Sequence, residues 1–218
     1  IAASGTVCDL ARAGLDSVAL RIPAHPLAQK LLAAFGRPIA APSANRSGQV
    51  SPTDADHVLA DLDGCIDLIL DGGPTSVGLE STIVACLDGR PALLRPGGVP
   101  REAIEARVGP LAGADTNALP RAPGMLASHY APRAALRLDA VDVRDGEAAL
   151  DFAGRLAGAR ARLDLSPAGD LVEAAANLFA YLRRLDATAA ATIAVAPIPE
   201  VGLGEAIYDR LRRAAAPR

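Results

Sequence analysis

Hydrophobic positions in the first half of the chain recur in patterns that predict short strands alternating with helices. Residues 17–22 alternate in polarity and are rich in strand-forming side chains, which predicts a strand that Pro23 ends. Pro26 is placed to open a helix, because apolar residues recur after it at helical spacing until Gly36. The same reasoning predicts strands at residues 38–41, 66–70, 81–87 and 92–95, the last two joined as a hairpin by the Asp-Gly turn at 88–89, and helices that begin at Thr53 and Pro100 and end at Gly64 and Gly109.

The pattern changes at residues 110–133, which are rich in Pro, Gly, Ala and polar residues and have no periodicity. Such a composition predicts an interdomain linker. Beyond it, strands and helices alternate again, which is typical of a small parallel α/β domain. The elements predicted there are strands at residues 163–165 and 192–196 and helices at residues 170–186 and 204–214. We therefore expect domains at residues 1–109 and 134–218.

Composition excludes several classes of protein. Half of the 218 residues are hydrophobic, which is enough for a sizeable core, and the formal net charge of -3 gives no overall basicity of the kind that nucleic-acid binding needs. Cys8, Cys65 and Cys86 form no Cys-x-x-Cys pair, so we expect buried free thiols rather than disulfides or zinc. Three scattered histidines predict no metal site. Without a membrane-spanning run or a signal peptide, the expected location is cytoplasmic.

Two polar turns are candidates for nucleotide binding. Residues 41–45 (Ala-Pro-Ser-Ala-Asn) follow a short apolar run, and Ser43 and Asn45 there can bind phosphate or ribose oxygens. Residues 72–82 are rich in Gly and hydroxyl groups and can present backbone N–H groups to an anion, although no P-loop lysine follows. Each segment also fits an ordinary turn, which Ser, Asn and Gly favour.

Charged and aromatic residues supply further candidates. Arg21 and Arg95 lie near strand ends, where an arginine can bind phosphate or carboxylate with its planar fork, or form a solvated surface ion pair. Tyr130 lies between prolines in the predicted linker and can close over a neighbouring site as a lid. His129 can act as a base, although the sequence offers it no paired acid. No single motif here is specific, but their order is.

That order resembles the two-domain, YrdC-type threonylcarbamoyl-AMP synthases. The motifs are residues 17–23 (Ser-Val-Ala-Leu-Arg-Ile-Pro), 41–45, 78–82 (Gly-Leu-Glu-Ser-Thr), 94–97 (Leu-Arg-Pro-Gly), 123–125 (Pro-Gly-Met) and 129–132 (His-Tyr-Ala-Pro), and the tail at 202–211 is similar to the family's accessory C-terminal domain. The resemblance implies an α/β fold: a partial YrdC-like twisted mixed sheet with helices, then the linker, then a small Rossmann-like α/β domain. Residues 1–109 would be the C-terminal portion of the catalytic domain.

The resemblance also implies the reaction and its site. Members of the family form threonylcarbamoyl-AMP and pyrophosphate from L-threonine, bicarbonate and ATP, normally with Mg²⁺, and partner proteins then transfer the threonylcarbamoyl group to tRNA. Contact with tRNA is thus indirect, with direct RNA contact as a further option. No catalytic residue is assigned. Family roles carry over as ATP contacts to Ser17, Ser43, Asn45, Ser51, Arg95 and Tyr130, and as threonine contacts to Arg21, Ala41 and Ser81.

One departure from the family pattern matters. The family's Lys-x-Arg motif, which lies before all the motifs above, has no counterpart here, and Lys30 lies within an amphipathic helix pattern. We therefore expect an N-terminally truncated synthase with weakened or absent activity. The alternative from another class is a non-catalytic RNA-binding YrdC-like module. Two weaker alternatives are a carbamoyl-transfer domain, which would need zinc-finger or acylphosphatase-like segments, and an NAD-binding domain, which would need a Gly-x-Gly-x-x-Gly motif.

Overall fold

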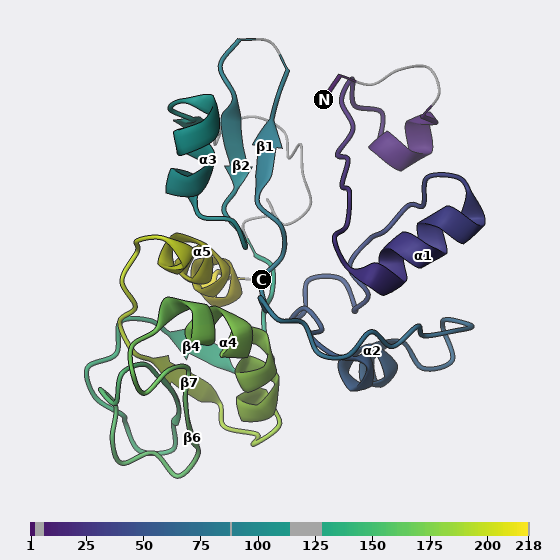
Figure 1. Cartoon of the computed structure of the whole chain (residues 1–218). Coiled ribbons are helices and arrows are strands. Elements are labelled where there is room, and N and C mark those ends of the chain that lie inside the picture. Colours follow the sequence, from purple (N-terminus) through teal and green to yellow (C-terminus); the bar gives the residue numbers. More distant parts are fainter. Residues whose placement is uncertain (3–6, 88, 114–127, 218) are drawn as a thin grey trace.

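The computed structural model describes residues 1–2, 7–87, 89–113 and 128–217. It is an α/β structure with two sheets, and Figure 1 shows the C-terminal sheet and its two helices beneath the β1–β2 hairpin. The described residues of the N-terminal part form a 3-10 helix, three α-helices and three short strands: η1 (Asp9–Arg12), α1 (Pro26–Phe35), α2 (Ala55–Leu62), β1 (Ile83–Ala85), β2 (Ala92–Arg95), α3 (Arg101–Val108) and β3 (Ala112–Gly113).

The helices of the N-terminal part begin and end largely where local sequence predicts. The α1 helix has Pro26 at its start and Gly36 in the left-handed region at its end, with φ 68°. For α2 the expected cap was wrong by one residue, because the side chain of Asp54, and not that of Thr53, accepts the hydrogen bond from the backbone N–H of His57. Asp and Thr are both good N-caps. Asp54 has an extended backbone and lies directly before the first helical residue, so its carboxylate, and not the Thr53 hydroxyl, caps the helix.

The N-terminal sheet has the order β1-β2-β3. β1 and β2 pair antiparallel, which confirms the predicted hairpin, although Asp88 of its turn lies outside the described residues. β3 pairs parallel with β2 and lies inside the segment predicted to be linker. It is a two-residue strand that local periodicity does not reveal, because a strand this short shows no alternation.

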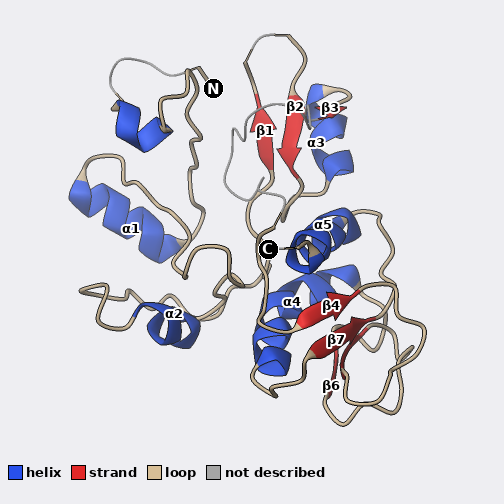
Figure 2. Cartoon of the chain, turned by 180° about the vertical axis from the view of Figure 1, so that it is seen from behind, coloured by secondary structure: helices blue, strands red, loops and turns tan. Residues whose placement is uncertain are grey.

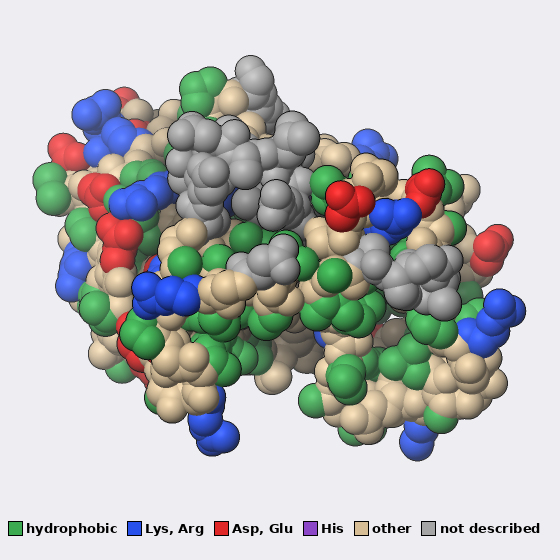
Figure 3. Space-filling view, turned by 90° about the horizontal axis from the view of Figure 1, so that it is seen from above, with side chains coloured by type: hydrophobic (Ala, Val, Ile, Leu, Met, Phe, Trp, Pro, Cys, Tyr) green, Lys and Arg blue, Asp and Glu red, His purple; other side chains and the backbone are tan. Residues whose placement is uncertain are grey.

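Three predicted strands are not strands. Residues 17–22, 38–41 and 66–70 are irregular, apart from an isolated bridge between Ala2 and Ser17. A strand exists only through its ladder of hydrogen bonds, and the described residues offer these segments no partner. Their apolar side chains consequently face outward: Ile22 is 95% exposed and Leu68 74% exposed. Figure 3 shows hydrophobic side chains reaching the surface across much of one face of the molecule.

The C-terminal sheet is fully parallel, as predicted, with the order β4-β7-β5-β6. Local patterns identified two of its strands but missed β4 and β5. Both helices pack against this sheet and against each other (Figures 1 and 2). The elements are β4 (Ala135–Arg137), β5 (Ala148–Asp151), β6 (Arg162–Asp164), α4 (Leu171–Asp186), β7 (Thr192–Val195) and α5 (Leu203–Ala215).

The hydrophobic core belongs mainly to the C-terminal part. Leu150, Leu178 and Ile193 are 0% exposed, as expected where a helix covers a parallel sheet. Val50 and Tyr130 join the same core, so the loop before α2 and the end of the linker segment are anchored to it. This shared core fixes the position of the loops described below relative to α4 and α5.

Two other expectations concern the surface. Cys8, Cys65 and Cys86 are all exposed, so the expectation of buried thiols was wrong. Apolar neighbours in the sequence do not bury a cysteine when the segment that carries it lies at the surface. Among the described residues, no helix has the length and apolar character to cross a bilayer.

Candidate functional site

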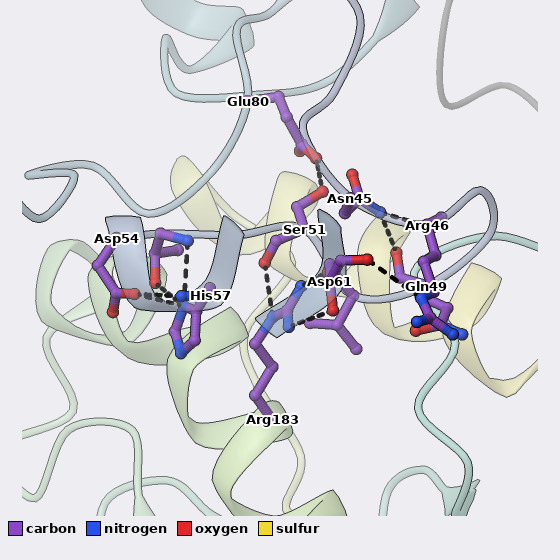
Figure 4. Close-up of polar contacts among 11 residues, drawn as sticks. Asn45, Arg46, Gln49, Ser51, Asp54, His57, Asp61, Glu80 and Arg183 are labelled. Atoms are coloured by element: carbon purple, nitrogen blue, oxygen red, sulfur yellow. Dashed lines mark hydrogen bonds and ion pairs between the residues drawn. The ribbon is translucent and has the colours of Figure 1, made fainter. Parts of the chain in front are cut away.

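Five polar and aromatic residues from distant parts of the sequence meet between the N-terminal and C-terminal parts: Ser51, Glu80, Arg95, Tyr130 and Arg210. We call them the Glu80 cluster. The hydroxyl of Ser51 donates to Oε1 of Glu80 at 2.7 Å (Figure 4). The guanidinium of Arg210, on α5, donates to Oε2 of Glu80 at 2.8 Å. Glu80 therefore joins the loop before α2 to the last helix of the chain.

Arg95 and Tyr130 complete the cluster. Arg95 is the last residue of β2 and is only 4% exposed. It donates to the carbonyl oxygen of Ser81 at 2.8 Å and forms a hydrogen bond with the hydroxyl of Tyr130. Tyr130 is 1% exposed, its ring stacks on Phe179 of α4, and its φ of 61° lies in the left-handed region. A non-glycine residue held there costs roughly 1–3 kcal/mol, so the surrounding contacts must fix this tyrosine firmly.

The electrostatics of the cluster follow from burial and pairing. Burial alone would raise the pKa of Glu80, but the charge and hydrogen bond of Arg210, with the hydrogen bond of Ser51, outweigh it and lower the pKa. Burial lowers the pKa of the Arg95 guanidinium and raises that of the Tyr130 phenol, because it penalises the charged form of each. Glu80 is therefore an anion, and Arg210 and Arg95 are cations beside it.

Asn45 lies in the adjacent loop and is 9% exposed (Figure 4). Its Nδ2 donates to the carbonyl oxygens of Arg46 at 2.9 Å and Gln49 at 3.1 Å. Two carbonyl acceptors fix the orientation of the amide, because only its NH₂ end can donate to both. The other end of the amide, Oδ1, is buried and has no hydrogen-bond partner among the described residues. A buried acceptor without a partner calls for an explanation, and a polar group of a ligand bound at this loop is one.

Glycines allow the loops of the site to approach closely. A Cβ atom on Gly97 would lie 2.3 Å from the carbonyl oxygen of Glu80, so no other residue fits there without backbone movement. A Cβ atom on Gly78 would lie 2.3 Å from the carbonyl oxygen of Ala175 in α4, and Gly78 also has a φ of 73°. The Gly residues of the motifs at 78–82 and 94–97 thus place Glu80 between β2 and α4.

The structure brings together several of the residues that the sequence proposed. Ser51, Arg95 and Tyr130 belong to the cluster, and Ser81 contacts it through Arg95. Asn45 lies in the loop that contains Gly48, whose carbonyl oxygen accepts a hydrogen bond from the backbone N–H of the residue after Tyr130, at 2.9 Å.

The contacts that define the cluster do not include the other four candidates. Ser17 forms the isolated bridge with Ala2, and Arg21, Ala41 and Ser43 are exposed. His129 packs edge-on against Tyr130, and burial lowers its pKa, which keeps it neutral near pH 7. The motif at residues 123–125 lies outside the described residues.

Sequence reasoning missed Glu80 and Arg210 as members of the site. Glu80 belongs to the motif at residues 78–82, but nothing in the sequence gives it a partner. Arg210 left a clearer signal, because helical spacing puts it on the same face as Ile207, Leu211 and Ala214, which are all buried. A charged residue on an apolar helix face needs a buried partner, and that requirement can be read from the sequence alone.

Two protein-family models together match nearly the whole chain. A family model described as "Telomere recombination", of the Sua5, YciO and YrdC proteins, matches residues 2–97. A second, described as "Threonylcarbamoyl-AMP synthase, C-terminal domain", matches residues 99–216. The chain belongs to the threonylcarbamoyl-AMP synthase family. The resemblance read from the order of its motifs is thereby confirmed.

Individual members of the threonylcarbamoyl-AMP synthase family support this assignment. The chain is 40% identical to the threonylcarbamoyl-AMP synthase of Bacillus subtilis over 94% of its own length and 65% of that protein. It is 40% identical to the synthase of Pyrococcus abyssi over 94% of its length and 66% of that protein. The chain thus spans about two thirds of the length of these relatives.

Solved structures of the threonylcarbamoyl-AMP synthase family agree with the fold. The crystal structure of P. abyssi Sua5 complexed with L-threonine superimposes with a TM-score of 0.89, at 38% identity, and covers 97% of this chain and 68% of that one. A P. abyssi Sua5 variant with an adjacent histidine and tyrosine replaced by alanine gives a TM-score of 0.87. The predicted fold class, a mixed sheet with helices followed by a parallel α/β part, is confirmed.

The depressed pKa of Glu80 predicts a specific pH dependence of stability. The folded chain binds fewer protons at Glu80 than the unfolded chain, so this stabilisation is fully present above the ordinary pKa of 4.5 and is lost as pH falls below it. We expect Glu80→Gln to be less stable than the wild type at pH 7, and the difference to shrink below pH 4.5. Urea unfolding between pH 7 and 3 measures it. Asp67→Asn, at an exposed carboxylate, is the control; a constant difference across this range would contradict the assignment.

Proposed function

We propose that the protein is an L-threonylcarbamoyladenylate synthase, a nucleotidyltransferase that forms threonylcarbamoyl-AMP and pyrophosphate from L-threonine, bicarbonate and ATP. The observation that carries the proposal is the convergence of Asn45, Ser51, Arg95 and Tyr130 beside one another, with the buried Oδ1 of Asn45 lacking a hydrogen-bond partner among the described residues. Family membership supports it, as does the likeness to P. abyssi Sua5, whose crystal structure is a complex with L-threonine.

The nucleotide site would use uncharged acceptors for the nucleoside and cations for the phosphates. Oδ1 of Asn45 would accept from a ribose hydroxyl or the adenine amino group, and the hydroxyl of Ser51 would add a further contact. Release of pyrophosphate breaks the bond between the α- and β-phosphates, so negative charge develops at the leaving group. The cation of Arg95 would stabilise that charge at low dielectric, and Tyr130 would help to exclude water. Ser17 and Ser43 are proposed as further hydroxyl contacts to ATP.

Threonine would bind at the exposed candidates and at Ser81. The guanidinium of Arg21 suits the threonine carboxylate, and backbone groups of Ala41 would orient the amino acid. Ser81 lies next to Glu80, and its carbonyl oxygen is already held by Arg95, so threonine and nucleotide contacts would share one structural unit. No residue is assigned as a general base.

Magnesium and the tRNA partners complete the proposal. The described residues contain no group of three or more His, Cys, Asp or Glu side chains placed to hold a metal ion. We therefore assign no protein cage to Mg²⁺, which would arrive bound to the phosphates of ATP. Partner proteins would transfer the threonylcarbamoyl group to an adenosine of tRNA. The chain would act in the cytoplasm, where these substrates meet.

The RNA-binding alternative receives less support than the synthase. The model that matches residues 99–216 and the named relatives point to threonylcarbamoyl-AMP synthases. A module that only binds RNA would also rely on a basic surface, and the chain has 22 Lys and Arg against 25 Asp and Glu.

Nucleotide binding is the sharper test, because it probes the proposed contact of Asn45 directly. We expect calorimetry to detect ATP binding in the presence of threonine, and Asn45→Ala to weaken it about tenfold through loss of the unpartnered acceptor oxygen. Gln49→Ala, which keeps the backbone carbonyl that Asn45 uses, is the matched control. Threonine-dependent pyrophosphate release then tests the chemistry. Absence of ATP binding, or equal binding by the Asn45→Ala variant, would refute the proposal.

A further inference from the structure

Arg210 is a fully buried cation that the reaction itself does not account for. It lies on α5, is 0% exposed and contacts four other residues. It donates to Oε2 of Glu80 at 2.8 Å, to Oδ2 of Asp209 at 2.6 Å and to the carbonyl oxygen of Pro96 at 3.0 Å. Its guanidinium carbon also lies 5.1 Å from the centre of the Tyr130 ring.

These contacts connect segments that lie far apart in the sequence. Glu80 is 130 residues before Arg210, and Pro96 is 114 residues before it. A guanidinium has several N–H groups in a fixed planar arrangement, so it can donate to two carboxylates and a carbonyl at once. The flat face of the same group can also lie over an aromatic ring. A buried charge is costly unless it is fully paired, so the chain keeps these groups together as a set.

We propose that Arg210 is a positioning residue for the nucleotide site: from the C-terminal part it holds Tyr130 directly and Ser51 through Glu80. The inference rests on the proposed function, in which Ser51 and Tyr130 contact ATP. Arg210 itself reaches neither substrate in this scheme. Its effect passes through the hydrogen bond between the Ser51 hydroxyl and Glu80, and through its contact with the tyrosine ring.

A second set of contacts from the C-terminal part independently supports the same loops. Arg183 of α4 donates to the carbonyl oxygens of Val50 and Ser51, and it pairs with Asp61 at 2.6 Å (Figure 4). The backbone of Gly78 lies directly against α4. The C-terminal part thus holds the Ser51 loop at its backbone through Arg183 and at its side chain through Arg210. This gives that part of the chain a role that no sequence motif assigned to it.

The test compares Arg210→Gln and Arg210→Lys with Arg212→Gln. Arg212 is on the same helix, its side chain is 61% exposed and it pairs with Glu200, so its variant is the matched control. The lysine variant keeps a charge opposite Glu80 and therefore allows the measurement if the glutamine variant does not fold. The first readout needs no ligand: nitration of tyrosines by tetranitromethane, located by mass spectrometry. Tyr130 is 1% exposed in the wild type, and Tyr181 is the internal standard.

We expect Tyr130 to be nitrated at least about tenfold faster in the Arg210 variants, with the Tyr181 rate unchanged, because the ring loses one of the groups that cover it. The second readout is the dissociation constant for ATP, expected to rise about tenfold for Arg210→Gln and less for Arg210→Lys, with Arg212→Gln unchanged. A folded Arg210 variant with wild-type nitration and wild-type ATP affinity would overturn the inference. If the wild type binds no ATP, the proposed function fails, and the nitration rates still decide whether Arg210 holds Tyr130.

Discussion

Replacing Arg95 by glutamine is expected to weaken ATP binding about 100-fold. Arg95 is buried at the end of β2, where it holds the carbonyl oxygen of Ser81 and the hydroxyl of Tyr130. Glutamine keeps a donor but loses the charge, and a buried hydrogen bond to a charged group contributes about 1.5–3 kcal/mol. At 1.4 kcal/mol per factor of ten in affinity, the upper part of that range gives the expected loss.

Calorimetric titration with ATP in the presence of threonine measures this effect. The matched control is Arg90→Gln, because Arg90 lies exposed beside the turn of the same hairpin and donates only to the carbonyl oxygen of Pro110 among the hydrogen bonds of the described residues. We expect this control to bind ATP like the wild type. Equal affinities for the Arg95 variant and the wild type would exclude Arg95 from the phosphate site.

Replacing Gly78 by alanine is expected to lower the free energy of unfolding by at least about 3 kcal/mol. Two separate costs add at this position. The φ of 73° strains any residue with a Cβ atom, and that atom would lie 2.3 Å from the carbonyl oxygen of Ala175 and 2.6 Å from the Cα atom of Ala176. The loop carrying Glu80 would have to move away from α4, which disrupts the cluster as well.

Gly73→Ala separates the two costs of the Gly78 substitution. Gly73 has a similar φ of 82° in the same loop, but a Cβ atom there would meet nothing within 4 Å. We expect this control to lose only about 1 kcal/mol, the cost of the backbone strain alone. Urea unfolding of the two variants gives both values. Similar losses would mean that contact with α4 contributes nothing at Gly78.

Local sequence was sufficient for the elements whose stability is local. Pro26 marks the start of α1 and Gly36 marks its end, because each residue favours the backbone conformation found there. The hairpin between β1 and β2 followed from its turn, and α4 followed from the apolar face of residues 170–186. The order of the short motifs was sufficient to identify the family.

Three features depended on tertiary contacts. Residues 17–22 have the pattern of a strand but no ladder partner among the described residues, and alternation alone cannot supply one. The roles of Glu80 and Arg210 follow from a contact across 130 residues, which local spacing does not encode. The apolar face of α5 could be read from the sequence, and so could the presence of Arg210 on it. Only packing of α5 against the loops around Glu80 and Pro96 determined which groups neutralise its charge, because a buried ion pair requires both partners to meet in space.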